Sequence, residues 1–99
     1  MAYRLLQTSE FTQWLKNLEN TIRGRIELHI KRAKSGNFGD HKSVGDGVFE
    51  MRINFGPGYR LYYYEVEKTI YLLLVGGDKS TQETDIRRAK EIKERELES

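Results

Sequence analysis

Hydrophobic residues recur every three or four positions through the first third of the chain, which is the spacing of amphipathic helices. They form two sets, namely Phe11, Trp14, Leu15 and Leu18, and then Ile22, Ile26, Ile30 and Ala33. A short strand is expected before them at residues 3–7, and the hydroxyl of Thr8 or Ser9 can cap the first helix by accepting a backbone N–H bond. The pattern therefore predicts one strand followed by two helices.

From residue 47 the hydrophobic period changes to two, which is the period of a strand with one buried face. Strands are predicted at residues 47–55, 59–66 and 69–75, with turns at 56–58 and 67–68. Beyond residue 81 the chain is rich in Glu, Lys and Arg and has only a thin apolar stripe. This composition predicts a short, mostly solvated C-terminal helix.

The order of these elements favours an α+β fold, because helices gathered before a run of antiparallel strands pack together on one face of the sheet. The chain has 99 residues and a mass of 11.6 kDa, which is enough for one compact domain. We therefore assign residues 1–99 to a single domain, with two N-terminal helices on one face of an antiparallel sheet. The opposite face is expected to be open.

Composition excludes several kinds of chemistry. The chain has no cysteine, which removes disulfides, thiolate nucleophiles and zinc–thiolate sites. His29 and His41 are the only imidazoles and lie in no metal-binding spacing, so we expect no metal and no cofactor. The longest apolar run, at residues 70–75, is far shorter than the roughly 20 residues that span a membrane. We expect a soluble, cytoplasmic protein.

Positive charge is concentrated in the middle of the chain, although the net charge is only +2. Residues 21–60 carry eight basic and four acidic side chains. Much of this surplus lies on one face of the predicted second helix, at Arg23, Arg25, Lys31, Arg32 and Lys34. Such a face is either a solvated surface, an approach for RNA or DNA, or a contact for an acidic protein.

A pair of arginines gives the clearest candidate site. A hairpin centred near Gly56 places Arg52 almost opposite Arg60, and like charges at such positions are destabilising unless an anion binds between them. The pleat is expected to expose one set of side chains, namely Arg52, Asn54, Arg60, Tyr62 and Tyr64. This face suits a phosphate chain with bases stacked on tyrosine. In the alternative interpretation, Glu50 and Glu65 neutralise the arginines and the tyrosines only cover the sheet.

Two loops are weaker candidates. Residues 76–82, with Lys79, lead into the last helix and form either an anion site at its N-terminus or a strand exit with a Ser or Thr cap. Residues 36–47, with His41 and Lys42, form either a mobile loop that carries an acid or base, or a solvated loop without a role.

Four blocks of the sequence together match a known pattern. They are Gly36-Asn37-Phe38-Gly39-Asp40, Gly47-Val48-Phe49-Glu50-Met51-Arg52-Ile53, Gly56-Pro57-Gly58-Tyr59-Arg60-Leu61-Tyr62-Tyr63 and Leu72-Leu73-Leu74-Val75-Gly76-Gly77-Asp78-Lys79-Ser80-Thr81-Gln82. These blocks resemble the RelE/ParE superfamily of type II toxins, and in particular its HigB-like "addiction module killer" branch. The match covers nearly the whole chain.

The resemblance implies a microbial-RNase-like fold, which is a twisted antiparallel sheet with two N-terminal helices on one face, and ribosome-dependent endoribonuclease cleavage of mRNA. In that reaction the ribose 2′-hydroxyl attacks phosphorus, so the protein must help move protons and stabilise a phosphorane, without a metal. Arg60 matches the arginine that follows Gly-Tyr in RelE and stabilises the phosphate. Lys79 falls close to the basic residue after the last strand, and Arg52 matches an arginine two positions beyond a lysine.

The chain also departs from the RelE pattern. Val48 and Glu50 stand where RelE has lysines, and the terminal segment reads Glu83-Thr84-Asp85, without the tyrosine of RelE or the histidine of HigB. The general acid and base therefore stay unassigned. Our hypothesis is that the phosphate is bound by Arg52, Arg60 and Lys79, with proton transfer assisted by Tyr62 or by His41 and Lys42.

The resemblance implies partners as well. An antitoxin is expected, of the helix-turn-helix DNA-binding kind, and so are the ribosome and its mRNA. One alternative is a ParE-like inhibitor that binds DNA gyrase and cleaves nothing. Another is a binding module that has kept only its pairing with the antitoxin.

Overall fold

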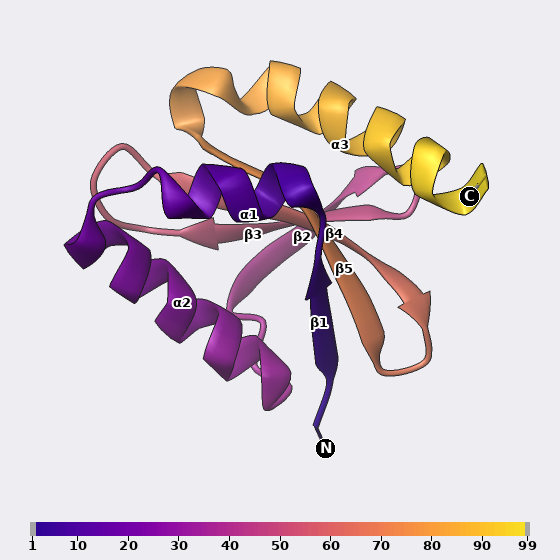
Figure 1. The fold of residues 1–99 in the computed structure, drawn as a ribbon, viewed down its shortest axis with the longest axis horizontal. Helices are drawn as coiled ribbons and strands as arrows, with labels where there is room; N and C mark the ends of the chain where they lie inside the picture. The colour runs from indigo at the N-terminus through magenta and orange to yellow at the C-terminus, as the bar shows by residue number, and fades with distance from the viewer. Residues whose placement is uncertain (1, 99) are drawn as a thin grey trace.

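The computed structural model describes residues 2–98 and contains five strands, three α-helices and one 3₁₀ turn (Figure 1). In chain order these are β1 (Arg4–Gln7), α1 (Ser9–Lys16), α2 (Asn20–Lys34), β2 (Asp40–Gly45), β3 (Val48–Ile53), β4 (Tyr59–Glu67), β5 (Ile70–Asp78), the 3₁₀ turn η1 (Lys79–Thr81) and α3 (Gln82–Glu98). The α+β class and the two N-terminal helices are confirmed.

The five strands form one mixed sheet in the order β1-β5-β4-β3-β2. Strands β2 to β5 are antiparallel, as predicted, but β1 pairs with β5 in parallel, with Leu5 beside Tyr71. The prediction of a wholly antiparallel sheet is therefore wrong at this edge. Only strands joined by a short turn must run antiparallel, and α1, α2 and three strands separate β1 from β5 along the chain.

Strand β2 corrects the prediction of a loop over residues 36–47. It pairs with β3 in register from Asp40 opposite Arg52 to Ser43 opposite Phe49. The sequence does not reveal β2 because an edge strand with polar side chains lacks the alternation that marks a half-buried strand.

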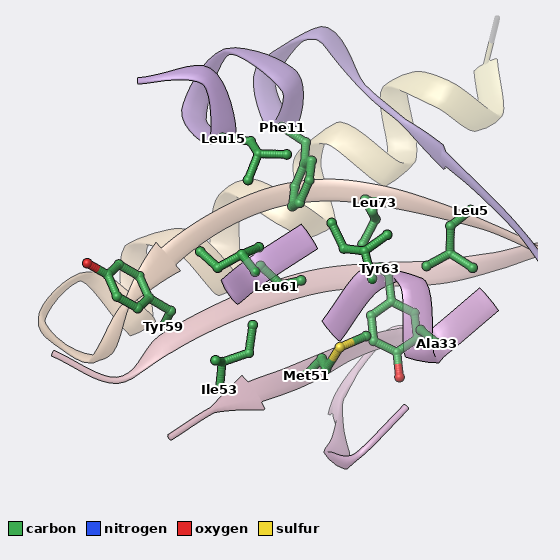
Figure 2. Packing of buried hydrophobic residues seen from close by; sticks show 12 residues of the cluster. Leu5, Phe11, Leu15, Ala33, Met51, Ile53, Tyr59, Leu61, Tyr63 and Leu73 are labelled. Carbon is green, nitrogen blue, oxygen red and sulfur yellow. The ribbon is translucent and has the colours of Figure 1, made fainter. Parts of the chain in front are cut away.

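Helices α1 and α2 pack on one face of the sheet. Thr8 caps α1, as predicted: its Oγ1 accepts a bond from the Phe11 N–H at 3.0 Å and donates to the Leu74 carbonyl at 2.6 Å. Figure 2 shows Phe11 and Leu15 of α1 directed at Leu61 and Leu73 of the sheet. The helices thereby bury the face of β3 and β4 that the two-residue period identified.

Helix α3 covers the second face, which corrects the prediction of an open sheet and a short terminal helix. It has 17 residues, and its Ala89 and Ile92 are buried in a second core. The other buried members of this core are Val48, Tyr62, Tyr64, Leu72, Leu74 and Val75. A three-layer arrangement results, in which the central strands are buried on both sides.

Charged contacts hold α3 against the rest of the fold. Arg95 forms a two-pronged ion pair with Glu10 of α1, at 2.6 and 3.1 Å, and this pairing lowers the pKa of Glu10 to about 2. Lys90 lies 3.5 Å from the Asp46 carboxylate, and Lys93 donates to the Asp46 carbonyl. These contacts connect α3 to α1 and to the turn between β2 and β3.

Two adjacent glycines let side chains approach β5 closely. A Cβ added at Gly76 would lie 2.2 Å from the Trp14 ring, and one added at Gly77 would lie 1.8 Å from the Asp85 carboxylate. Any larger residue at either position would displace α1 or the start of α3. Within residues 2–98, no helix is both long and apolar enough to cross a membrane.

Candidate functional site

Arg52 of β3 lies directly opposite Arg60 of β4, which confirms the predicted register of the hairpin. The Glu50 carboxylate, which has no exposed surface, lies between them. Its Oε1 accepts bonds from Arg52 Nε at 3.1 Å and from Arg60 Nη1 at 3.0 Å. A single buried carboxylate therefore relieves the repulsion between the two guanidinium groups.

The second oxygen of Glu50 is also fully engaged. Oε2 accepts a bond from the Tyr62 hydroxyl at 3.0 Å and from Gln82 Nε2 at 2.9 Å. Burial alone would raise the pKa of Glu50, but its bonds from Arg52, Gln82 and Tyr62 outweigh burial and lower that pKa. We call these five residues the Glu50 cluster, and its carboxylate is ionised at neutral pH.

The Glu50 cluster keeps one surplus positive charge, because two arginines face one carboxylate. The predicted neutralisation by Glu50 is therefore partial. The Arg52 side chain is 32% exposed and the Arg60 side chain 12% exposed, so neither side chain is fully buried. Within residues 2–98, the buried Arg60 Nε has no hydrogen-bond partner. The arrangement can still bind an anion at its outer edge.

The predicted exposure of Tyr62 and Tyr64 is wrong, because α3 buries both side chains. Burial and the charge of Glu50 raise the pKa of Tyr62 far above its usual range. Its hydroxyl is held against Glu50 at 3.0 Å. In this structure Tyr62 therefore positions the cluster and does not present its hydroxyl to solvent.

Lys79 begins η1 and lies beside the β3–β4 turn. Its backbone N–H donates to the Pro57 carbonyl at 3.4 Å, and its Cβ lies 3.5 Å from the position of a Cβ built on Gly58. Asp78 caps the 3₁₀ turn η1, because its carboxylate accepts a hydrogen bond from the Ser80 N–H at 2.8 Å. Of the two alternatives predicted for residues 76–82, the structure shows a capped strand exit, but the cap is Asp78 and not a Ser or Thr.

Asp85, in the first turns of α3, is a feature that the sequence interpretation did not assign. Its carboxylate packs against Gly77, which lies directly opposite Arg60 in the sheet, and accepts a bond from Thr81 Oγ1 at 2.5 Å. Burial and the charge of Asp78 raise the pKa of Asp85, although the bond from Thr81 opposes this. The sequence offered one sign that Asp85 lies near the site: it is three residues after Gln82, and this spacing places both side chains on one face of α3.

His41 and Lys42 point to opposite faces of β2. His41 is paired with Met51 and contacts Phe38 on the α2 side, with ring centroids 6.2 Å apart, whereas Lys42 is paired with Glu50 on the α3 side. The structure therefore separates the two residues that the sequence interpretation grouped together, and it places only Lys42 on the face of the Glu50 cluster.

The basic residues predicted on one face of the second helix also separate. Arg25 lies over the Phe55 ring at 4.8 Å and lines a groove that it shares with Arg52. Arg23 instead bonds to Asn20 and to the Lys16 carbonyl near the start of α2, and Lys31 is exposed. Of the basic residues of α2, Arg25 and Arg32 line that groove, whereas Arg23 and Lys31 do not.

The fold is that of RelE toxins. Over 93% of this chain and 99% of the other, the structure superposes on a free-state mutant of Escherichia coli RelE with a TM-score of 0.73 at 21% identity. A RelBE2 toxin–antitoxin complex of Mycobacterium tuberculosis matches with a TM-score of 0.65 at 20% identity, over 80% of this chain and 100% of the other. The fold implied by the resemblance to the RelE/ParE superfamily is therefore confirmed.

The sequence defines a narrower family. Residues 13–96 match the family described as "Phage derived protein Gp49-like (DUF891)", so the chain belongs to the Gp49-like family. An uncharacterized protein of Haemophilus influenzae is 47% identical over 91 residues, covering 91% of this chain and 92% of that protein. The HigB-like branch stays a prediction.

Proposed function

We propose that this protein is the toxin of a type II toxin–antitoxin module, and that it is an endoribonuclease that cleaves mRNA at the ribosome in the cytoplasm. The observation that carries the proposal is the cross-strand pair Arg52 and Arg60 on a RelE fold. The pair keeps a surplus positive charge beside an exposed edge, as phosphate recognition requires.

The Glu50 cluster supports a defined division of roles. Arg60 and Arg52 would bind the scissile phosphate and stabilise the negative charge that develops when the ribose 2′-oxygen attacks phosphorus. Lys79, beside the turn that joins β3 to β4, would contribute a further positive charge. Glu50 and Tyr62 would hold the guanidinium groups in place before substrate binds, which lowers the cost of organising them in the transition state.

Asp85 is the carboxylate that we propose as the base for the 2′-hydroxyl proton. It packs against the backbone opposite Arg60, and it also lines an open groove between α1 and α3 beside Trp14 and Arg88. Solvent and substrate can therefore reach it. A raised pKa makes a carboxylate a stronger proton acceptor.

This assignment predicts an acid limb in the pH profile of cleavage. Because the carboxylate is the active form, the rate should fall as pH falls through the raised pKa of Asp85. Asp85→Asn should lower the single-turnover cleavage rate on programmed ribosomes by about 10²-fold or more and should remove that limb. Glu83→Gln, an exposed neighbour on α3, is the control. An unchanged limb in Asp85→Asn would assign the base elsewhere.

An antitoxin is the partner that we propose, since RelE-type neighbours are known in toxin–antitoxin complexes from Escherichia coli and Mycobacterium tuberculosis. We expect it to be a helix-turn-helix DNA-binding protein. Its co-expression should restore growth of cells that produce this chain, which would also separate toxicity from a general burden of expression.

Transcript mapping after induction tests the whole proposal. New 5′ ends within translated regions, lost when translation is blocked beforehand, are the expected result. Intact transcripts together with induction of the DNA-damage response would instead indicate a gyrase inhibitor. Intact transcripts without growth arrest would leave a protein that only pairs with its antitoxin.

A further inference from the structure

We propose that the groove between α2 and the end of β3 is a binding site for single-stranded RNA, which continues the track of the substrate backbone beyond the scissile phosphate. This inference rests on the proposed function, because it assumes that Arg52 and Arg60 face a phosphodiester. It adds the path that the RNA takes across this protein, which neither the fold nor the relatives specify.

The groove has a volume of about 440 Å³, and most of the charged side chains that line it are positive. Arg25, His29 and Arg32 line it from α2. Their spacing of four and three residues places them in one stripe along the helix. Arg52 lines the groove from β3, and Asp40 is the acidic residue in its wall. Arg52 is also paired with Glu50, but three arginines against Asp40 still leave the groove with an excess positive charge that suits a phosphate backbone.

The groove is continuous with the Glu50 cluster through one side chain. Arg52 donates its Nε to Glu50 at 3.1 Å, lies opposite Arg60, and also lines the groove. An RNA phosphate held at Arg60 therefore has its neighbour within reach of Arg52, and the following phosphates within reach of α2. This continuity favours the same RNA strand as the occupant over a separate acidic protein.

The groove also offers a surface for a base. The Phe55 ring is partly exposed, and the Arg25 guanidinium lies 4.8 Å from its centroid. Aromatic rings and guanidinium planes are the groups on which unpaired bases stack, and stacking tolerates any base. A groove with phosphate-binding cations and one stacking platform is typical of sites that bind single strands without strong sequence preference.

The His29 imidazole lies in the groove and is sensitive to the charges around it. Burial, and then the charge of Arg32, lower the pKa of His29. The charged groups around it are Arg25 and Arg32 on its own helix, with Asp40 and Arg52 on the sheet. An RNA phosphate would add a negative charge beside this ring and would shift its NMR signals.

The test uses a 2′-O-methyl hexaribonucleotide, which binds but lacks the attacking hydroxyl. The wild-type protein is compared with Arg25→Gln/Arg32→Gln and with the matched pair Arg23→Gln/Lys31→Gln, which removes two charges from α2 outside the groove. The groove pair should weaken binding about tenfold or more at 0.1 M salt. Its salt-dependence slope should fall by about 1.4, since each phosphate contact with a single strand contributes about 0.7. The matched pair should change affinity less than about twofold.

A second readout uses the two histidines of the chain. His29 lies in the groove, whereas His41 contacts Phe38 on another part of the surface. Adding the oligonucleotide to uniformly labelled protein should shift the imidazole signals of His29 and leave those of His41 in place. The two rings belong to one sample, so no change in folding or concentration can imitate the difference.

Each outcome separates the groove from the proposed function. Equal losses of RNA affinity in the two variant pairs, or NMR shifts at both histidines, would overturn the proposed groove site. The RNA would then bind to a diffuse basic surface. Retained mRNA cleavage with no change in RNA binding by the groove pair would overturn the groove but not the nuclease. Shifts at His29 with an acidic peptide and none with RNA would assign the groove to a protein partner. Specific RNA binding without cleavage in cells would retain the groove and overturn the nuclease.

Discussion

Replacing Arg60 with alanine is expected to abolish growth arrest and to lower the mRNA cleavage rate by about 10²–10³-fold, which is the usual effect of removing one preorganised donor from a developing oxyanion. Arg60 lies near the start of the central strand β4, opposite Arg52, and is held by Glu50 at 3.0 Å, so it is positioned before substrate arrives. The measurements are colony formation after induction and single-turnover cleavage on programmed ribosomes.

Two controls separate the chemistry of Arg60 from its charge and its structural role. Arg60→Lys keeps a positive charge beside Glu50 but loses the planar fork, so it should fold normally and recover only a minor part of the cleavage rate. Arg87→Ala removes an exposed guanidinium from α3 and should leave toxicity unchanged. Full toxicity of a folded Arg60→Ala protein would show that the Glu50 cluster is not the phosphate site.

The position of Arg60 could be predicted because the hairpin determines it locally. Gly56-Pro57-Gly58 allows only a tight reversal, and the two-residue period on either side leaves one register that buries the apolar face. The opposition of Arg52 and Arg60 follows from these two constraints. No long-range contact is needed to establish it.

The burial of the site could not be predicted, because α3 causes it from a distance along the chain. The apolar stripe of α3 is narrow, and its buried members are Ala89 and Ile92. Its partners, Tyr62 and Tyr64, have side chains that suit a wet surface as well as a core. Only the three-dimensional arrangement decides between these environments.

The environment of Glu50 also could not be predicted from the local sequence. The sequence placed it on the face of Arg52, and it offered neutralisation as one interpretation. Its fourth donor, Gln82, lies 32 residues further along the chain, so the complete hydrogen bonding of the carboxylate depends on α3. The parallel pairing of β1 with β5 likewise joins strands that are far apart along the chain, so local sequence does not reveal it.

Replacing Glu50 with alanine is expected to lower the free energy of unfolding by roughly 3–5 kcal/mol, because removal of one partner leaves buried charges uncompensated. Arg60 would lose its ion pair with Glu50, and the hydrogen bonds from Tyr62 and Gln82 would be lost with it. Urea unfolding of wild type and Glu50→Ala at pH 7 measures this difference. Glu67→Ala, an exposed carboxylate on β4, should change stability by less than about 0.5 kcal/mol.

The pH dependence of this difference follows from the lowered pKa of Glu50. A carboxyl group with a folded-state pKa below its ordinary value of 4.5 stabilises the fold fully above that value, and the stabilisation is lost as pH falls through the folded-state pKa. The gap between wild type and Glu50→Ala should therefore narrow in acid. A gap that is independent of pH would indicate lost packing and not lost charge pairing.

A double variant separates the structural role of Glu50 from its role in activity. Glu50→Met/Arg60→Met removes both buried charges of the pair, and apolar replacement of a whole buried ion pair is often neutral or stabilising. We expect this variant to recover much of the stability that Glu50→Ala loses, while mRNA cleavage stays lost because the phosphate-binding guanidinium is gone. Stability would then recover without any recovery of cleavage, which a purely structural role for the Glu50 cluster does not allow.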